Sequence, residues 1–190
     1  MPSSKELVEL LDLETIDLNL FRGRQPDTML QRVFGGQVAA QALVAGARTV
    51  EPPLGVHSLH SYFLRPGDTA VPIVYDVERI RDGRSFSTRR IMARQHGRPI
   101  YLMTASFQKP EEGFDHQDVM PEVPTPAESV DMREVVRRRS SEAADDWMRE
   151  WEALEMRAVL PGQQVPGEPL AGSGCSPCCC SRSGQGRDLC

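Results

Sequence analysis

The stretch Phe34–Arg48, FGGQVAAQALVAGAR, decides the fold of this chain. Alanine favours helix more than any other residue, and five alanines and one glycine occupy the twelve positions from Gln37 to Arg48. We therefore predict a helix over Gln37–Arg48. Because its side chains are small, this helix can lie close against a curved sheet on several sides.

The two glycines before this helix bring bare backbone to its positively polarised end. The first four N–H groups of a helix lack partners within it, so they can bind a carbonyl oxygen or an anion. We predict that Gly35, Gly36 and Gln37 bind substrate in this way. Two alternatives stay open: the glycines only permit a tight turn into the helix, and Gln37 hydrogen-bonds a neighbouring loop.

Four strands after the helix predict an antiparallel meander. Alternating apolar and polar residues mark the strands, and turn residues separate them. The Asp-Gly pair within Arg81–Arg84 is typical of a hairpin turn because it tolerates positive φ. The predicted strands are His57–Arg65, one through Val71–Glu78, Ser85–Gln95 and Arg98–Gln108.

The N-terminal residues predict a short helix and one strand. Ser3 and Glu6 have the spacing of a capping box, and alternation over Ile16–Leu20 predicts a strand. A strand, a long alanine-rich helix and a meander wrapped around it form the hotdog arrangement. We therefore predict an α+β hotdog fold, with a single hotdog in residues 1–112.

A different composition begins after residue 112. Pro121, Pro124 and Pro126 mark a linker, and Ala127–Arg157 predicts one highly charged helix, so residues 113–158 form a second segment. Its apolar residues Trp147, Trp151 and Leu154 fall at helical spacing. We expect this face to cover the flank of the hotdog domain, with a partner protein as the alternative.

All five cysteines lie in the last 16 residues, from Cys175 to Cys190. Cys175 and Cys178 have a spacing that can ligate zinc, but three adjacent cysteines suit no ordinary tetrahedral site and no histidine follows. We expect no metal here. We predict that residues 159–190 form a disordered tail or are read from a shifted frame.

The composition argues against several classes of protein. A net charge of −5 argues against general nucleic-acid binding. No apolar run is long enough to span a bilayer, and the N-terminus has no hydrophobic signal region. A cytoplasmic protein is therefore expected.

The order of these motifs resembles the N-terminal half of type II acyl-CoA thioesterases, the bacterial and peroxisomal double-hotdog enzymes. The resemblance covers roughly residues 7–130. The stretches that carry it include Phe34–Gln37, Ala40–Leu43, His57–Phe63, Arg65–Asp68, Gly83–Ser87, Gln95–Gly97 and Ala105–Gln108.

The resemblance implies hydrolysis of fatty acyl-CoA to a free fatty acid and CoA, with no cofactor. In such enzymes a carboxylate, a hydroxyl residue and a glutamine of the second half orient the attacking water. Nothing after about Val159 resembles that half, so no catalytic residue is assigned. The alternative is a catalytically inactive hotdog module that binds acyl groups or dimerises. A hotdog dehydratase ranks below both, since no His–Asp pair adjoins Phe34 in the sequence.

Two further residues and one partner complete the prediction. Arg84 is a candidate contact for CoA phosphates, and Ser85, beside it in the family-like stretch Gly83–Ser87, is predicted to bind substrate as well. A lone hotdog sheet leaves an open edge, and unpaired edge strands invite association. We therefore predict a homodimer formed by pairing of sheet edges.

Overall fold

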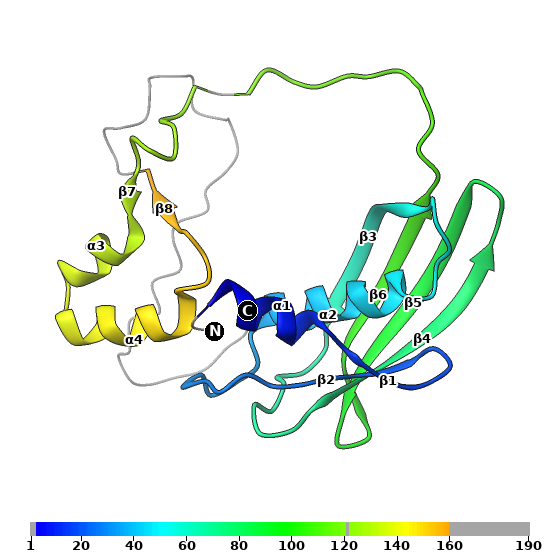
Figure 1. The fold of residues 1–190 in the computed structure, drawn as a ribbon, viewed down its shortest axis with the longest axis horizontal. Helices are drawn as coiled ribbons and strands as arrows, with labels where there is room; N and C mark the ends of the chain where they lie inside the picture. The colour runs from blue at the N-terminus through cyan, green and yellow to red at the C-terminus, as the bar shows by residue number, and fades with distance from the viewer. Residues whose placement is uncertain (1–2, 121, 160–190) are drawn as a thin grey trace, which may run out of the picture.

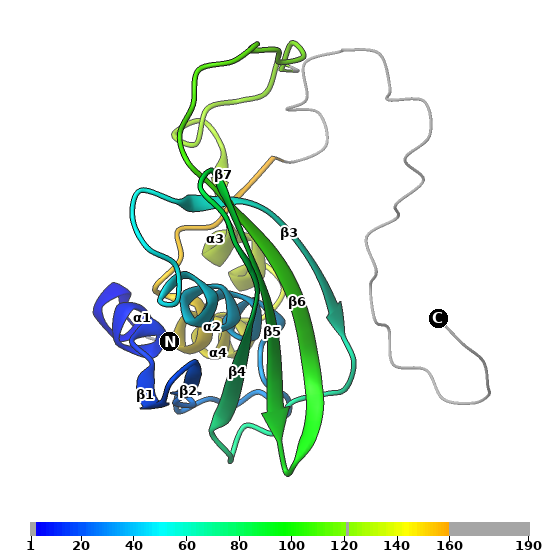
Figure 2. The ribbon, with the colours of Figure 1, turned by 90° about the vertical axis from the view of Figure 1, so that its right-hand side faces the viewer.

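The computed structural model describes residues 3–120 and 122–159. Helix α2 (Gly35–Ala47) lies against one face of a six-stranded antiparallel sheet, and helix α1 (Ser4–Leu11) packs beside it (Figure 1, Figure 2). This arrangement confirms the predicted α+β hotdog fold. The six strands of the sheet are β1 (Glu14–Asp17), β2 (Leu20–Gly23), β3 (Gly55–Phe63), β4 (Ile73–Asp82), β5 (Phe86–Gln95) and β6 (Arg98–Gln108).

The strands follow the order β1-β2-β4-β5-β6-β3, so β1 and β3 form the two edges of the sheet. Strand β4 pairs with β5, β5 with β6, and β6 with β3, all antiparallel. The predicted four-strand meander is therefore wrong in one respect: β4, β5 and β6 form a meander, but β3, the strand that follows the helix, pairs with β6 at the far edge and not with β4. This edge strand has nine residues, and the other has four.

Alternation along the strands builds the core. Ile73, Tyr75 and Val77 of β4 are buried, and so are Tyr101, Met103, Ala105 and Phe107 of β6. These side chains pack against Ala42 and Ala45 of α2, which are both fully buried. Small residues let α2 approach closely: a Cβ on Gly46 would lie 3.0 Å from the Ile91 side chain.

The buried polar side chain of Gln41 connects α2 to the elements around it. Gln41 donates to the carbonyls of Leu10 and Arg24 and accepts a hydrogen bond from the Tyr75 hydroxyl. A Cβ on Gly23 would lie 2.4 Å from the Gln41 amide oxygen, so any side chain there would displace the Gln41 amide. These bonds satisfy polar groups that would otherwise be costly to bury.

The strand predicted over Ile16–Leu20 is wrong, because the chain reverses there. Strands β1 and β2 pair antiparallel as a hairpin, with Asp17 opposite Leu20. Asn19 adopts a φ of 61°, which asparagine tolerates better than most residues. Asp17 accepts a hydrogen bond from the Leu18 amide, and Leu18 is 79% exposed. The apolar alternation therefore continued through a turn.

The hairpin between β4 and β5 occurs where predicted, but for a different reason. Gly83 has no positive φ; instead a Cβ there would lie 2.8 Å from the carbonyl oxygen of Phe86. The Gly83 amide donates to that same oxygen. Close backbone approach, rather than a left-handed conformation, requires the glycine.

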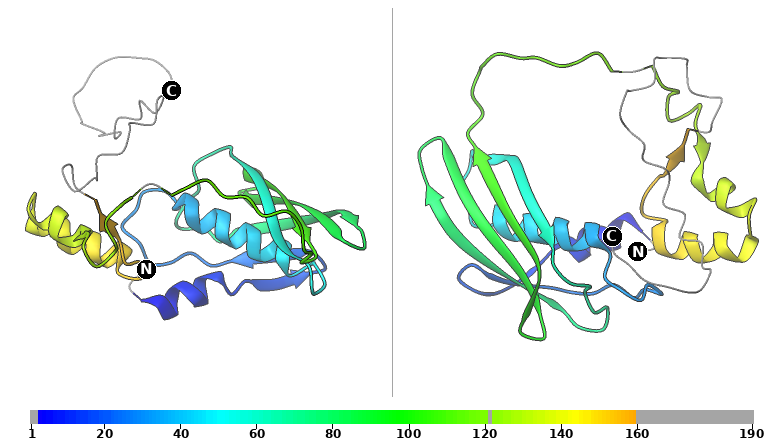
Figure 3. Two further views of the ribbon diagram at one scale, coloured as in Figure 1. Left: turned by 90° about the horizontal axis from the view of Figure 1, so that it is seen from above. Right: turned by 180° about the vertical axis from the view of Figure 1, so that it is seen from behind.

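The single helix predicted over Ala127–Arg157 is also wrong, since this segment contains two helices. Helix α3 (Met132–Arg137) and helix α4 (Ser141–Trp151) are visible in Figure 3. In chain order they follow β7 (Val130–Asp131) and precede β8 (Arg157–Ala158), and these two short strands pair with each other. Asp131 caps α3 by accepting from the Arg133 amide. The tail predicted over residues 159–190 lies outside the described residues, apart from Val159.

Candidate functional site at the start of α2

The first turn of α2 carries the predicted substrate-binding backbone. Phe34 is the N-cap, and the amides of Gln37 and Val38 both donate to its carbonyl oxygen. The N–H groups of Gly35 and Gly36 have no partner within the helix, because they precede its first turn of bonds. Donors for a substrate oxygen at this position are therefore Gly35 and Gly36 rather than Gln37.

The Gln37 side chain is buried, with 5% exposed, and it faces the preceding loop. Its amide nitrogen donates to the Gln25 side chain at 3.0 Å and to the Arg24 carbonyl at 3.4 Å. These bonds match the alternative prediction, in which Gln37 hydrogen-bonds a neighbouring loop. The side chain anchors the 24–34 loop against α2, and the backbone of the first turn stays at the surface.

Aromatic rings flank both glycines. A Cβ on Gly35 would lie 3.0 Å from the Phe63 ring, and a Cβ on Gly36 would lie 2.4 Å from the Phe34 ring. Trp151 of α4 packs edge to face on Phe34, with ring centroids 4.8 Å apart. A side chain at either glycine would push these rings aside, so the glycines let the Phe34 and Phe63 rings lie close to the helix start.

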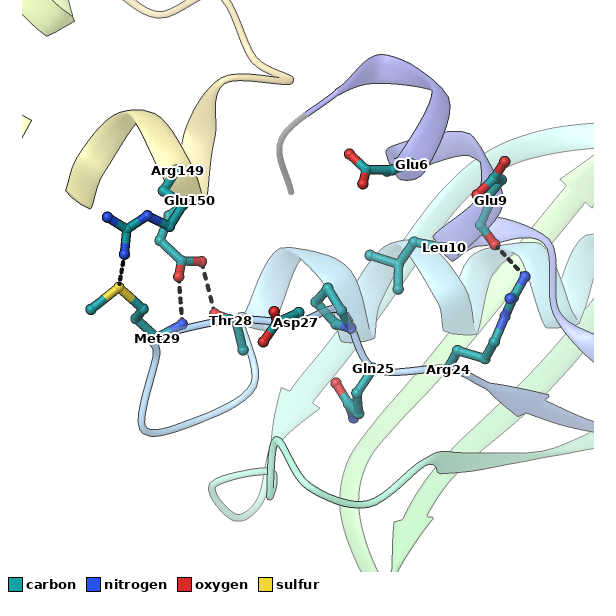
Figure 4. Close-up of a pocket in the computed structure, with 11 residues that line it drawn as sticks. Glu6, Glu9, Leu10, Arg24, Gln25, Asp27, Thr28, Met29, Arg149 and Glu150 are labelled. Carbon is teal, nitrogen blue, oxygen red and sulfur yellow. Dashed lines mark hydrogen bonds between the residues drawn. The ribbon is translucent and has the colours of Figure 1, made fainter. Parts of the chain in front are cut away.

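A pocket of about 430 Å³ lies beside this site, between α1, the 24–29 segment and α4 (Figure 4). Glu150 closes one side of it by accepting from the Met29 amide at 2.6 Å and from the Thr28 hydroxyl at 2.7 Å. The Arg24 guanidinium donates to the Glu9 carbonyl. None of the predicted substrate-binding residues lines this pocket.

Arg84 and Ser85 lie in the β4–β5 hairpin loop, at the other end of α2. Arg89 joins the base of that hairpin to Thr49, just beyond the C-terminus of the helix. Ser85 donates to Glu111 at 3.2 Å, and its carbonyl accepts from the Lys109 amide. Since a 13-residue helix is about 20 Å long, one chain does not bring Arg84 and Ser85 together with Gly35 and Gly36.

A histidine–aspartate pair lies at the same end of the molecule as the helix start. His96 Nε2 is 3.0 Å from the Asp68 carboxylate, and the Val33 amide donates to the neighbouring Gly67 carbonyl. The pKa of Asp68 is lowered, mainly by the hydrogen bond from the Ala70 amide and then by His96. No sequence pattern pointed to this pair, because 28 residues separate its members. Both side chains are about half exposed, so the pair is poorly placed to act on a buried substrate.

Comparison with known proteins identifies the domain. Residues 24–108 match the family described as acyl-CoA thioesterase N-terminal domain. Over these residues the chain is similar to that family. Acyl-CoA thioesterase 2 of Haemophilus influenzae is 50% identical over 125 residues, which are 66% of this chain and 44% of that protein. Human acyl-coenzyme A thioesterase 8 is 48% identical over 128 residues, 67% of this chain and 40% of that protein.

Solved structures are similar to this domain in fold. The acyl-CoA thioesterase II TesB2 of Mycobacterium marinum is 51% identical, with a TM-score of 0.58 over 64% of this chain and 45% of that one. A hotdog protein of Alicyclobacillus acidocaldarius is 26% identical, with a TM-score of 0.60 over 66% of this chain and 48% of that one. The chain thus spans less than half the length of the relatives named here.

Within residues 3–120 and 122–159, no group of three His, Cys, Asp or Glu side chains could hold a metal ion. Over the same ranges, no helix is both long and apolar enough to cross a membrane. The cysteines at 175–190 lie outside the described residues, so the expectation for them is not tested.

Proposed function

We propose that this chain acts on acyl-CoA, as part of a thioesterase that hydrolyses fatty acyl-CoA to a free fatty acid and CoA. The observation that carries the proposal is the 50% identity to acyl-CoA thioesterase 2 across the hotdog domain. The start of α2 supports it, because Gly35 and Gly36 offer backbone donors beside the aromatic rings of Phe34 and Phe63. Such donors stabilise the negative charge that develops on a thioester carbonyl oxygen during attack by water.

A direct assay tests the activity. The purified 190-residue chain is incubated with acyl-CoA substrates of several chain lengths, and released CoA is followed with a thiol-reactive dye. The reagent also reacts with free cysteines, so a substrate-free sample with the same protein concentration sets the baseline. Release above that baseline supports the proposal, and no release at any chain length contradicts hydrolysis by this chain alone.

A second candidate is a catalytically inactive module that binds acyl groups. What favours it is the short coverage: 56% of the Haemophilus relative has no counterpart in the matched part of this chain, since only 44% of that protein is covered. The water-orienting trio expected from the family resemblance belongs to a second half. Calorimetry with acyl-CoA separates the candidates, because the module binds without releasing CoA.

We also propose that β3 forms the homodimer contact. This edge strand exposes apolar side chains on both faces, including Val56, Leu59, Tyr62 and Phe63, which are between 47% and 63% exposed. Unpaired strand edges with apolar side chains favour strand pairing. Half-buried Ala39 and Leu43 of α2 extend the apolar surface beside it.

An antiparallel β3–β3 pairing would also reunite the predicted substrate contacts. Within one chain, β3 runs from the hairpin end of the sheet, where Gly55 pairs with Gln108, to Phe63 beside Gly35. A two-fold axis through β3 reverses this direction in the second copy. The Arg84 and Ser85 loop of one copy then lies at the same end as the Gly35 and Gly36 donors of the other. A cytoplasmic location stays a prediction from the sequence.

A further inference from the structure

One buried hydroxyl on the inner face of the sheet lacks a hydrogen bond. Tyr101 is 0% exposed, and its hydroxyl oxygen has no partner among the residues that the structure describes. A buried donor without an acceptor costs folding free energy. Native proteins leave few such groups, so each one needs an explanation.

A neighbouring tyrosine provides an internal comparison. Tyr75 lies in the same row across the sheet, since Ala93 pairs with Tyr75 on one side and with Tyr101 on the other. Tyr75 is also 0% exposed, but its hydroxyl donates to Gln41 at 2.7 Å. Burial raises the pKa of both tyrosines, so both phenols keep their protons at neutral pH. The Tyr75 hydroxyl has its hydrogen-bond acceptor within the fold, whereas the Tyr101 hydroxyl has none among the described residues.

The position of Tyr101 connects it to the helix start. It pairs with Phe63 on the edge strand β3, and the two rings are 4.8 Å apart. The same Phe63 ring covers Gly35, where a Cβ would lie 3.0 Å from it. Phe63 itself is 63% exposed. One exposed ring therefore covers both the Tyr101 side chain and the first turn of α2.

The Ser61 hydroxyl does not accept a hydrogen bond from the Tyr101 hydroxyl. Ser61 lies two residues before Phe63 on β3, near enough to Tyr101 to oppose part of the rise in its pKa. It is nevertheless outside hydrogen-bonding geometry for the Tyr101 hydroxyl. Ser61 and Tyr101 thus place two hydroxyls near each other beside the open edge strand β3.

We propose that Tyr101 is a substrate-binding residue whose hydroxyl donates to the carbonyl oxygen of the acyl-CoA thioester. Rotation of the exposed Phe63 ring opens the way from the surface beside β3. A neutral phenol suits this acceptor, because it provides a directional donor without placing a charge in an apolar site. The proposal rests on the proposed function, since it takes acyl-CoA as the ligand.

Two substrate analogues and one substitution test the contact. The ketone analogue, in which methylene replaces the thioester sulfur, keeps the carbonyl and resists hydrolysis. The S-alkyl-CoA thioether lacks the carbonyl. Calorimetry measures both analogues on the full chain and on Tyr101→Phe. We expect Tyr101→Phe to bind the ketone about tenfold more weakly, as for the loss of one hydrogen bond, and to bind the thioether unchanged.

Tyr75→Phe is the matched control, because it removes a phenol hydroxyl that already has a partner. We expect it to lower the melting temperature and to leave the affinity for both analogues unchanged. Tyr101→Phe should instead hold or raise the melting temperature of the ligand-free protein, since it removes an unmatched donor.

The outcomes separate the two proposals. If the wild-type chain binds both analogues and Tyr101→Phe changes neither affinity, or changes both equally, the Tyr101 contact is wrong and the proposed function stands. If the wild-type chain binds neither analogue and releases no CoA, the proposed function fails and the Tyr101 contact fails with it.

Discussion

Arg89 is a charged side chain in the core, with only 1% exposed. Its guanidinium donates to the Thr49 hydroxyl and carbonyl, to the carbonyls of Arg81 and Thr88, and to the Asp82 carboxylate. These bonds fasten the end of α2 to the β4–β5 hairpin. At the residue scale, one side chain therefore fixes the loop that carries Arg84 and Ser85.

Replacing this arginine should destabilise the fold strongly. Arg89→Met keeps the aliphatic volume but leaves buried carbonyls without donors, so we expect the free energy of unfolding to fall by about 3 kcal/mol. Urea denaturation followed by circular dichroism measures it. The control is Arg90→Met on the same strand, whose half-exposed ion pair with Glu78 should contribute no more than about 1 kcal/mol. Equal effects from the two substitutions would contradict the assigned role of Arg89.

Asp82 should make the free energy of unfolding depend on pH in the acidic range. The hydrogen bond from Arg89 is the main cause of its lowered pKa. Because the folded-state pKa lies below the unfolded value, the contribution of Asp82 is present above the unfolded pKa and is lost as pH falls through the folded pKa. We expect Asp82→Asn to be less stable at neutral pH, and to lose less further stability between about pH 5 and pH 2 than the wild type. Urea midpoints across this range measure it, and parallel pH profiles for both proteins would argue against the linkage.

At the scale of elements, α4 is held on the hotdog domain by its C-terminal turn. Trp151 packs on Phe34, and Glu150 accepts from the Met29 amide. Trp151→Ala should loosen this docking, since an aromatic pair contributes modestly beyond its buried area. We expect the Met29 amide to exchange its hydrogen about twofold to tenfold faster, corresponding to that contribution, as measured by hydrogen exchange. Glu152→Ala, at the exposed neighbour of Trp151, serves as the control and should leave Met29 protected.

At the scale of the whole molecule, the open β3 edge should decide the oligomeric state. Leu59→Lys places a charge where the apolar edge strand would meet its copy. We expect the wild type to sediment as a dimer of the 21.2 kDa chain and the variant as a folded monomer. Analytical ultracentrifugation measures both. Ile80→Lys is the control, because Ile80 is 50% exposed, as against 49% for Leu59, but lies in the interior strand β4. A monomeric wild type would rule out the β3 dimer.

Local patterns predicted most of the hotdog domain. The alanine-rich stretch after Phe34, the capping box at Ser3 and the alternation through the meander each act within a few residues of the chain, so the sequence contains their cause. Two predictions, the strand over Ile16–Leu20 and the single helix over Ala127–Arg157, failed because the chain turns within each segment. Asn19 reverses the chain inside an apolar alternation, and the 138–140 segment separates α3 from α4 although the charged pattern continues through it.

By itself, the sequence determined the central helix that begins at residues 34–37, the four strands after it, and which faces of those strands are apolar. Only the tertiary structure decided that Phe63 covers Gly35, that Trp151 meets Phe34, and that Arg84 lies at the opposite end of α2 from the glycines. It also decided that the Tyr75 hydroxyl has a partner and the Tyr101 hydroxyl has none. The reason is physical: propensity and periodicity act between near neighbours in the chain, whereas hydrogen-bond partners and ring contacts depend on strand order and on side chains far apart in sequence.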